Sequence, residues 1–382
     1  MIKKNFLFIG LCFLFVGCKI SKTTSDESIL YEIYLDDAIK KSFTLSDIAD
    51  SIEYVYLQEP VTADYISKID VSENYALFRE SLSGRILLFH RDGRFINQIG
   101  LVGNGPGEYA RHVYDVLLDE KRNAIYVLEL FEGRILQYEI NGSFVTTITL
   151  GHDACSMGLI EPGYIIVHIG NWTGDKENRF VIINDKGDIV KEFKNPYKYT
   201  MKHGGPWKPE CIKYIYNNNL HIKDKGDTLY MVSKDHQLIP RFVFKNKCSI
   251  PSNNLTQEQY DRAIQFLSAF ETDQRLYFTF YSCNKTEGKG SDLIRHAYFE
   301  KKTGKTYIYK PEKNEFRIKN DIDDALYFTW SQNNACLFHT RTDFDDSVFE
   351  KAKPEVREKI QKLRSSINDE DPAFLSILYL KK

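Results

Sequence analysis

The chain has 382 residues, of which 42% are hydrophobic and 14% aromatic, and its formal net charge is −2. This length suits one large domain, and removal of Lys3 and Lys4 with a leader would make the net charge −4. The charge argues against a nucleic-acid partner, because such proteins need a basic surface to neutralise phosphates.

The first 18 residues predict a lipoprotein signal peptide. A basic start is followed by an apolar run, residues 6–16, which is too short to span a bilayer. The end of this run overlaps Phe15-Val16-Gly17-Cys18, which resembles a lipobox with phenylalanine where leucine is usual. Lipidation of Cys18 would anchor the mature chain to a membrane surface, whereas the alternative is an ordinary cleaved signal.

The lipobox predicts a cell-envelope protein that is anchored at the outer membrane, on either its periplasmic or its surface face. Residues 19–29 are polar and are expected to form a flexible tether. No other run approaches 18 apolar residues, so the rest of the chain is expected to lie outside the bilayer.

The dominant pattern from residue 30 onward is a repeated β-hairpin. Gly84-Arg85-Ile86-Leu87 precedes a turn at Gly93 by nine residues, and Gly133-Arg134-Ile135-Leu136 precedes Gly142 by the same distance. Further copies turn near residues 187, 235 and 304, so successive turns are 49, 45, 48 and 69 residues apart. Periods of about 40–50 residues with several strands each are typical of β-propellers. A β-sandwich, or two unrelated β-domains, is the alternative.

Two segments depart from the β-pattern. Apolar residues at helical spacing in residues 255–270 follow a helix-start pattern at Thr256 and predict a helical insertion. This insertion would explain the long interval before the last turn. Pro354 opens a second predicted helix, residues 354–367, whose many charged residues indicate a solvated face.

Residues 95–129 resemble an NHL-type repeat: a glycine-rich loop, Gly103 to Gly107, precedes an aromatic residue and two apolar strands split by a polar turn. The whole chain, including its ending at residues 371–381, resembles the six-bladed β-propeller lipoproteins of Gram-negative anaerobes, most of which have no assigned function. The resemblance implies an all-β, six-bladed propeller over residues 30–382 as a single domain. The terminal strand, residues 374–380, would close the ring with the N-terminal strands.

Four loop residues are candidates for ligand contacts. A tryptophan beside polar groups can stack on a sugar ring or a peptide, although Trp207 could instead fill a gap between blades. Scattered histidines are more often structural than catalytic. The candidates are His112, Trp172, His203 and Trp207.

The sequence predicts no catalytic residue, metal ligand or cofactor. It contains neither a Gly-x-Ser-x-Gly elbow nor a His-Glu-x-x-His motif. Five of the seven cysteines lie beyond Cys18 at long spacings without a zinc pattern, so mostly free, buried thiols are expected.

These features favour a binding or scaffold module: a lipid-anchored propeller whose loop face holds a glycan, a peptide or a partner protein. The alternative is a lyase or hydrolase acting on a sugar or ester. Such an enzyme would use histidines and carboxylates at the channel mouth, such as Asp115 and Glu129, and could use Ca²⁺. Exposed aromatic and amide side chains at the mouths would favour the first hypothesis, and converging histidines and carboxylates the second.

Overall fold

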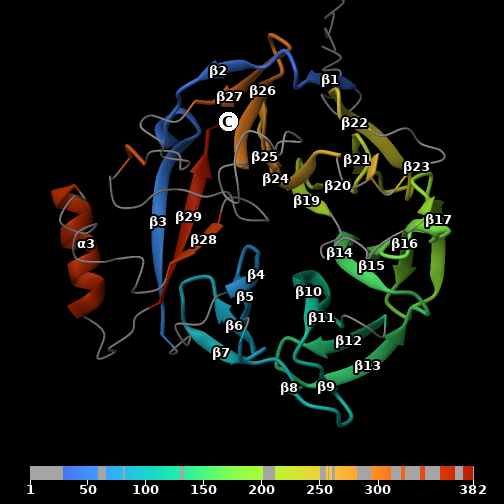
Figure 1. Cartoon of the computed structure of the whole chain (residues 1–382). Helices are drawn as coiled ribbons and strands as arrows, with labels where there is room; N and C mark the ends of the chain where they lie inside the picture. Colours follow the sequence, from blue (N-terminus) through green and yellow to red (C-terminus); the bar gives the residue numbers. More distant parts are fainter. Residues whose placement is uncertain are drawn as a thin grey trace, which may run out of the picture.

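The computed structural model describes residues 29–58, 66–80, 82–129, 133–200, 211–249, 255–256, 258–259, 263–281, 294–310, 320–322, 336–339, 353–365 and 373–381. It shows a β-propeller, with sheets arranged around a centre and the first strand of each blade innermost (Figure 1). The expected signal peptide, Cys18 and residues 19–28 of the tether lie outside the described residues. Among the described helices, none is long and apolar enough to cross a membrane.

Five blades share one arrangement of four antiparallel strands in chain order. Their strands are β4 (Ile66–Val71), β5 (Tyr75–Glu80), β6 (Ile86–His90) and β7 (Phe95–Gln98); β10 (Val113–Asp119), β11 (Ala124–Glu129), β12 (Arg134–Glu139) and β13 (Phe144–Thr149); β14 (Ala154–Glu161), β15 (Tyr164–Ile169), β16 (Asn178–Asn184) and β17 (Ile189–Lys194); β19 (Ile212–Tyr216), β20 (Asn219–Lys223), β21 (Thr228–Val232) and β22 (Leu238–Lys245); β24 (Gln265–Glu271), β25 (Arg275–Tyr281), β26 (Ile294–Glu300) and β27 (Lys305–Tyr309).

The predicted hairpin repeat is confirmed as the outer hairpin of each blade. Gly93, Gly142, Gly187 and Gly304 all adopt positive φ in the turn between the third and fourth strands. In the fourth blade, His236 adopts positive φ in this turn. Glycine has no Cβ and reaches this backbone region with little strain. The five copies of the repeat are therefore the five blades.

The prediction of six blades is not confirmed, because the structure shows five blades of this kind. The remaining position of the ring holds a sheet with three strands in the described residues: β28 (Cys336–His339), β29 (Ala373–Leu380) and β3 (Ala49–Leu57). β29 pairs antiparallel with β28 on one side and with β3 on the other. Its strands come from both ends of the chain, which explains why this sheet lacks the hairpin repeat.

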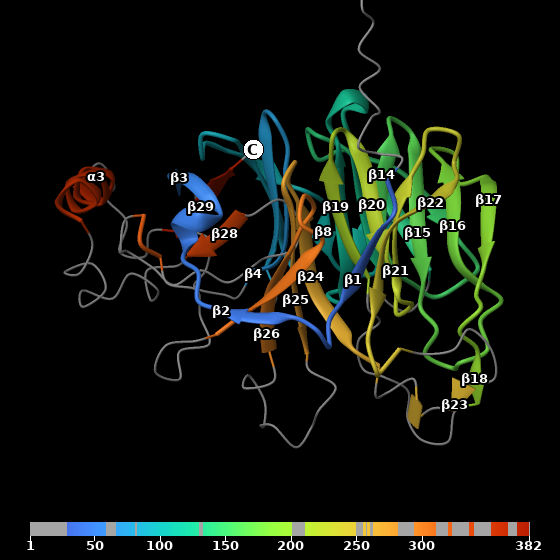
Figure 2. The same ribbon diagram turned by 90° about the horizontal axis from the view of Figure 1, so that it is seen from above.

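The predicted helical insertion at residues 255–270 is wrong for its second half. Gln265–Glu271 is β24, the inner strand of the fifth blade, and Ala269 lies opposite Phe278 of β25. Strand pairing and burial outweighed the helical spacing of the apolar residues. Thr256 does accept a hydrogen bond from the Gln259 N–H at 3.1 Å, as expected of a helix start. The second predicted helix corresponds to α3 (Pro354–Ser365), which lies outside the ring (Figures 1 and 2).

Short N-terminal strands cover the outer edges of two blades. β1 (Tyr31–Tyr34) pairs in parallel with β22, and β2 (Ile39–Lys41) pairs in parallel with β27. Within the described part of the chain, β7, β13 and β17 each end their sheets without such a cover. The other short elements are η2 (Leu45–Asp47), η3 (Glu120–Arg122), β8 (Leu101–Val102), β9 (Glu108–Tyr109), β18 (Tyr199–Thr200) and β23 (Leu255–Thr256).

Candidate functional site

The four candidate ligand residues do not form one described cluster. His112 is exposed and directly precedes β10. Trp172 is half-buried and stacks on Tyr114, with ring centroids 5.7 Å apart and planes at 18°. His203 and Trp207 lie outside the described residues. One face of the Trp172 ring therefore packs against a neighbouring blade.

A buried ion pair lies at the centre of the ring, where inner strands meet. Lys213 Nζ of β19 lies 2.6 Å from Asp115 Oδ2 of β10. The same carboxylate accepts hydrogen bonds from Ser156 Oγ at 2.8 Å and from the Met157 N–H at 2.9 Å. Asp115 thus joins three inner strands and is occupied by partners from this chain.

The charges of this centre are coupled. Burial by itself would raise the pKa of Asp115, but the positive charges of Lys213 and Lys68 and its hydrogen bonds lower the pKa below its usual range. Burial lowers the pKa of Lys68, although Asp115 opposes this shift. Burial raises the pKa of Asp70, which accepts a hydrogen bond from the Leu118 N–H at 3.0 Å. The arrangement is that of a structural ion network.

Cys155 and His168 form a buried pair in the third blade, with Sγ 2.9 Å from Nδ1. A thiol beside an imidazole has the residue types of a nucleophile and its base. Here burial raises the pKa of Cys155 well above its usual value and lowers the pKa of His168 to about 4. Both groups are therefore neutral near pH 7, and a neutral buried thiol is a poor nucleophile.

A second buried network ties the fourth and fifth blades together around Glu271. Arg241 Nη2 and Lys301 Nζ each lie 2.7 Å from Glu271 Oε1, and the Tyr214 hydroxyl donates to Oε2 at 3.0 Å. Arg241 also donates to the carbonyl of Ile29 at 3.3 Å, beside the start of β1. This network therefore fixes the N-terminal strand to the ring. Among the described residues, no group of three or more His, Cys, Asp or Glu could hold a metal ion.

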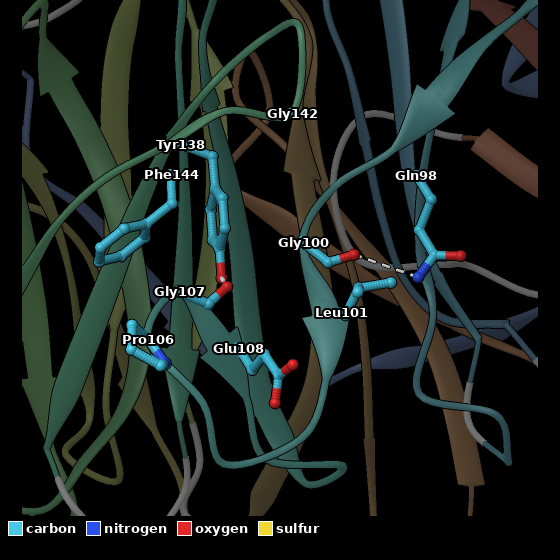
Figure 3. Close-up of a pocket in the computed structure, with 9 residues that line it drawn as sticks. All are labelled: Gln98, Gly100, Leu101, Pro106, Gly107, Glu108, Tyr138, Gly142 and Phe144. Atoms are coloured by element: carbon cyan, nitrogen blue, oxygen red, sulfur yellow. Dashed lines mark hydrogen bonds between the residues drawn. The ribbon is translucent and has the colours of Figure 1, made fainter.

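An open pocket of about 410 Å³ lies between the first and second blades, beside the glycine-rich loop. Figure 3 shows Tyr138 and Phe144 on one side and Gln98 and Leu101 on the other, with the Glu108 carboxylate between them. Tyr138 and Phe144 meet edge to face, with centroids 5.8 Å apart. The Phe144 side chain is 41% exposed and Leu101 is 58% exposed. The pocket thus offers apolar surface around one carboxylate.

Hydrogen bonds hold this pocket in shape. Glu108 Oε2 accepts from the Gly105 N–H at 2.7 Å, and the Tyr138 hydroxyl donates to the Gly107 carbonyl at 3.0 Å. A Cβ on Gly103 would lie 1.9 Å from Glu108 Oε2, and a Cβ on Gly107 would lie 2.7 Å from the Phe144 ring. The glycines therefore allow the carboxylate and the ring to approach the loop.

Sequence reasoning found the loop but missed the pocket. Gly103 to Gly107 was expected to connect blades, and this segment does lie between β7 and β10. The missed residues, Tyr138 and Phe144, belong to the second blade and lie 30 or more positions further along the chain. An available signal was the aromatic residue directly after the Gly142 turn.

Comparisons with known proteins place the chain in a family without assigning it a role. No curated protein matches it. A solved exported-protein candidate from Bacteroides fragilis is 19% identical, with a TM-score of 0.61, and the match covers 93% of this chain and 100% of that one. A DUF4221-family protein from Bacteroides vulgatus is 11% identical, with a TM-score of 0.48 and coverage of 87% and 98%.

The likeness to the Bacteroides fragilis structure supports the fold alone. The resemblance to NHL-type repeats stays a prediction. The family model described as "Domain of unknown function (DUF4934)" matches residues 30–378. The chain therefore belongs to the DUF4934 family.

Proposed function

We propose that this protein is a binding module of the cell envelope and that the pocket between its first two blades holds the ligand. The observation that carries the proposal is the pairing of an exposed aromatic ring, Phe144, with a preorganised carboxylate, Glu108, in a pocket of about 410 Å³. Ligand pockets commonly combine apolar walls with a few oriented polar groups at about this volume.

The ligand classes remain those expected from the sequence: a glycan, a peptide or a partner protein. The alternative is a lyase or hydrolase that uses Asp115 and Glu129. Both carboxylates are occupied by partners within the chain, which gives this alternative no support. Asp115 is paired with Lys213 at 2.6 Å. Glu129 is paired with Arg134 at 2.7 Å and accepts from the Ala110 N–H at 2.7 Å.

Attachment to the membrane through lipids on Cys18 is part of the proposal. The lipobox-like signal supports it, and an exported-protein candidate shares the fold. Labelled fatty acid should be incorporated into the wild-type chain and not into Cys18→Ala. Equal labelling of both chains would contradict the anchor.

The pocket is tested by binding to a glycan array and to a random peptide library. The variant is Leu101→Ser combined with Phe144→Ser, which removes apolar surface from the pocket. The matched control is Ile189→Ser on β17, where the side chain is 50% exposed outside the pocket. At least one ligand class should bind the wild type and the control about tenfold more tightly than the double variant, a difference of about 1.4 kcal/mol. Equal binding by all three proteins would remove the pocket from the function.

A further inference from the structure

The outer strand of the second blade has an unprotected edge. β13 pairs with β12 on one side and, in the described part of the chain, with no strand on the other. Its sequence, FVTTIT, carries no charge, and Phe144 and Val145 are 41% and 49% exposed. Proteins usually protect such edges with charged residues, proline or a covering segment. β17 follows that rule, since its sequence IVKEFK includes three charged residues.

The backbone of β13 can accept another strand. The Leu150 N–H donates to the Gly133 carbonyl at 2.8 Å, and the register then runs without a break to Thr146 opposite Gln137. In an antiparallel pair, the backbone N–H and C=O groups of every second residue point toward the partner strand. Since Leu150 bonds to Gly133, directly before β12, the N–H and C=O groups of Thr147 and Thr149 point away from β12. In the part of the chain that the structure describes, no strand pairs with these donors and acceptors at the rim.

The chain itself shows how such an edge is filled. β1 lies in parallel along β22, and the Leu35 N–H donates to the Lys245 carbonyl at 3.0 Å. β2 lies in parallel along β27, and the Lys310 N–H donates to the Lys41 carbonyl at 3.0 Å. β13 occupies the equivalent outer position in its blade (Figure 1). Two of the five blades therefore already use strand addition in parallel.

The proposed binding pocket lies at the start of this edge. Phe144 is both the first residue of β13 and part of the pocket wall. Glu108 Oε2 is held by Gly105, whereas Oε1 accepts no hydrogen bond from another described residue. A lysine or arginine side chain suits this site, since its apolar stem can cover Phe144 and its charged head can reach Glu108.

We infer that an extended peptide segment of a partner protein adds to β13 as a parallel strand and places a lysine or arginine from its N-terminal end in the pocket. This inference rests on the proposed binding function and names its ligand. Backbone hydrogen bonds provide general affinity in strand addition, and pockets for individual side chains provide specificity. A second copy of the chain fits less well, because a twofold axis would pair two β13 strands antiparallel.

The inference is tested by selection of random twelve-residue peptides displayed on phage against the full chain. Enriched peptides should alternate apolar and polar residues and carry lysine or arginine near the N-terminal end. Their affinities are then measured by fluorescence polarisation. Glu108→Gln should weaken them about tenfold, and Ile189→Ser, the control on β17, should leave them unchanged.

Strand addition itself is tested by changing the backbone of the protein and, separately, the backbone of the peptide. Thr147→Pro removes an outward N–H from β13 and should abolish binding, because proline is tolerated where the N–H faces solvent but cannot donate. N-methylation of alternate residues in an enriched peptide should weaken binding at least tenfold, and it leaves the protein unaltered.

Other outcomes overturn the inference in distinguishable ways. If peptide affinity depended on the pocket but was unchanged by Thr147→Pro and by N-methylation, strand addition would be rejected. The proposed function would still stand. The inference would also be overturned if peptides were enriched no more on the wild type than on Thr147→Pro. A dimer seen by light scattering that Thr147→Pro dissociates would overturn it too. If every ligand bound the pocket variants as tightly as it binds the wild type, the proposed function itself would be rejected.

Discussion

At the scale of single residues, one ion pair recurs in two blades. Arg85 makes two hydrogen bonds to Glu80, at 2.7 and 2.9 Å, and Arg134 lies 2.7 Å from Glu129. In each case the glutamate ends the second strand and the arginine lies five positions later. The sequence contains this spacing in its two clearest repeat copies. The spacing does not predict the ion pair of the third blade, where Arg179 instead lies 3.5 Å from Asp224.

The residue that tests the centre of the ring is Asp115. In Asp115→Asn, Lys213 loses its charge partner at 2.6 Å and Lys68 loses a stabilising negative charge. Removal of one partner of a buried ion pair costs about 3–5 kcal/mol, since an uncompensated charge is left behind. We expect the free energy of unfolding in urea at pH 7 to fall by about this amount.

The control for this prediction is Asp92→Asn in the first outer hairpin. Asp92 pairs with Arg94 at 2.9 Å, but both side chains are more than half exposed. Exposed pairs contribute about 0–1 kcal/mol, so this variant should unfold almost as the wild type does. Similar midpoints for the two variants would mean that the central network contributes little to stability.

At the scale of elements, the loop from Gly100 to Gly107 shows what local sequence can and cannot reveal. Its glycines predicted an irregular connection between blades, and the structure has one there. Their spacing does not reveal which neighbours approach them. Tyr138 and Phe144 reach the loop from the second blade, so the pocket depends on packing between blades.

Gly107→Ala should destabilise the protein more than a strained backbone alone would. Gly107 has φ of +72°, and an added Cβ would lie 2.7 Å from the Phe144 ring. Gly151 has a similar φ of +68° with nothing within 4 Å of an added Cβ. We expect Gly151→Ala to cost about 1 kcal/mol from the left-handed backbone alone, and Gly107→Ala about 2–3 kcal/mol, since it adds a clash.

Urea unfolding of both glycine variants separates the two costs. Equal losses of stability would show that the Phe144 ring moves aside freely, and that the pocket wall is not fixed by the loop. A larger loss for Gly107→Ala would tie the shape of the pocket to the packing of the loop.

Elements outside the repeat were harder to predict. Residues 265–271 have apolar side chains at helical spacing, yet they form β24 because β25 provides the pairing partner. β1 and β2 are short and could not be assigned to particular edges, because their partners β22 and β27 lie more than 200 residues away. The local pattern therefore failed in two ways: at β24 pairing with the adjacent β25 outweighed helical spacing, and at β1 and β2 the partner was distant.

At the scale of the whole molecule, the repeat period predicted the propeller and its five hairpins. The count of six blades came from the resemblance, and the structure shows five four-stranded blades and one sheet with three described strands. The sequence also predicted closure by the chain ends, and β29 does pair with β3 through eight residue pairs from Ala373 to Leu380. The pocket beside the glycine-rich loop and the β13 edge could not be predicted, since both depend on how one blade meets the next.

The closing strand provides the test of the ring as a unit. β29 lies between β28 and β3, and its buried Leu375 and Ile377 pack in one cluster with Phe78 of the first blade. On its other side, Leu378 packs in a cluster with Phe270 of the fifth blade. Loss of residues 373–382 would expose both clusters and the edges of both flanking strands.

We expect this truncation to abolish cooperative unfolding near the wild-type midpoint, because the loss exceeds about 5 kcal/mol, the lower range of total domain stability. Removal of Lys382 alone is the control and should leave the midpoint unchanged, because it keeps the hydrogen bond from the Lys381 N–H to the Ile48 carbonyl at 2.9 Å. Circular dichroism during heating and resistance to limited proteolysis would measure both. A synthetic peptide spanning residues 371–382 should restore resistance when added to the truncated chain. A truncated chain that melts as the wild type does would show instead that the five blades hold one another without closure, and that the paired chain ends serve another purpose.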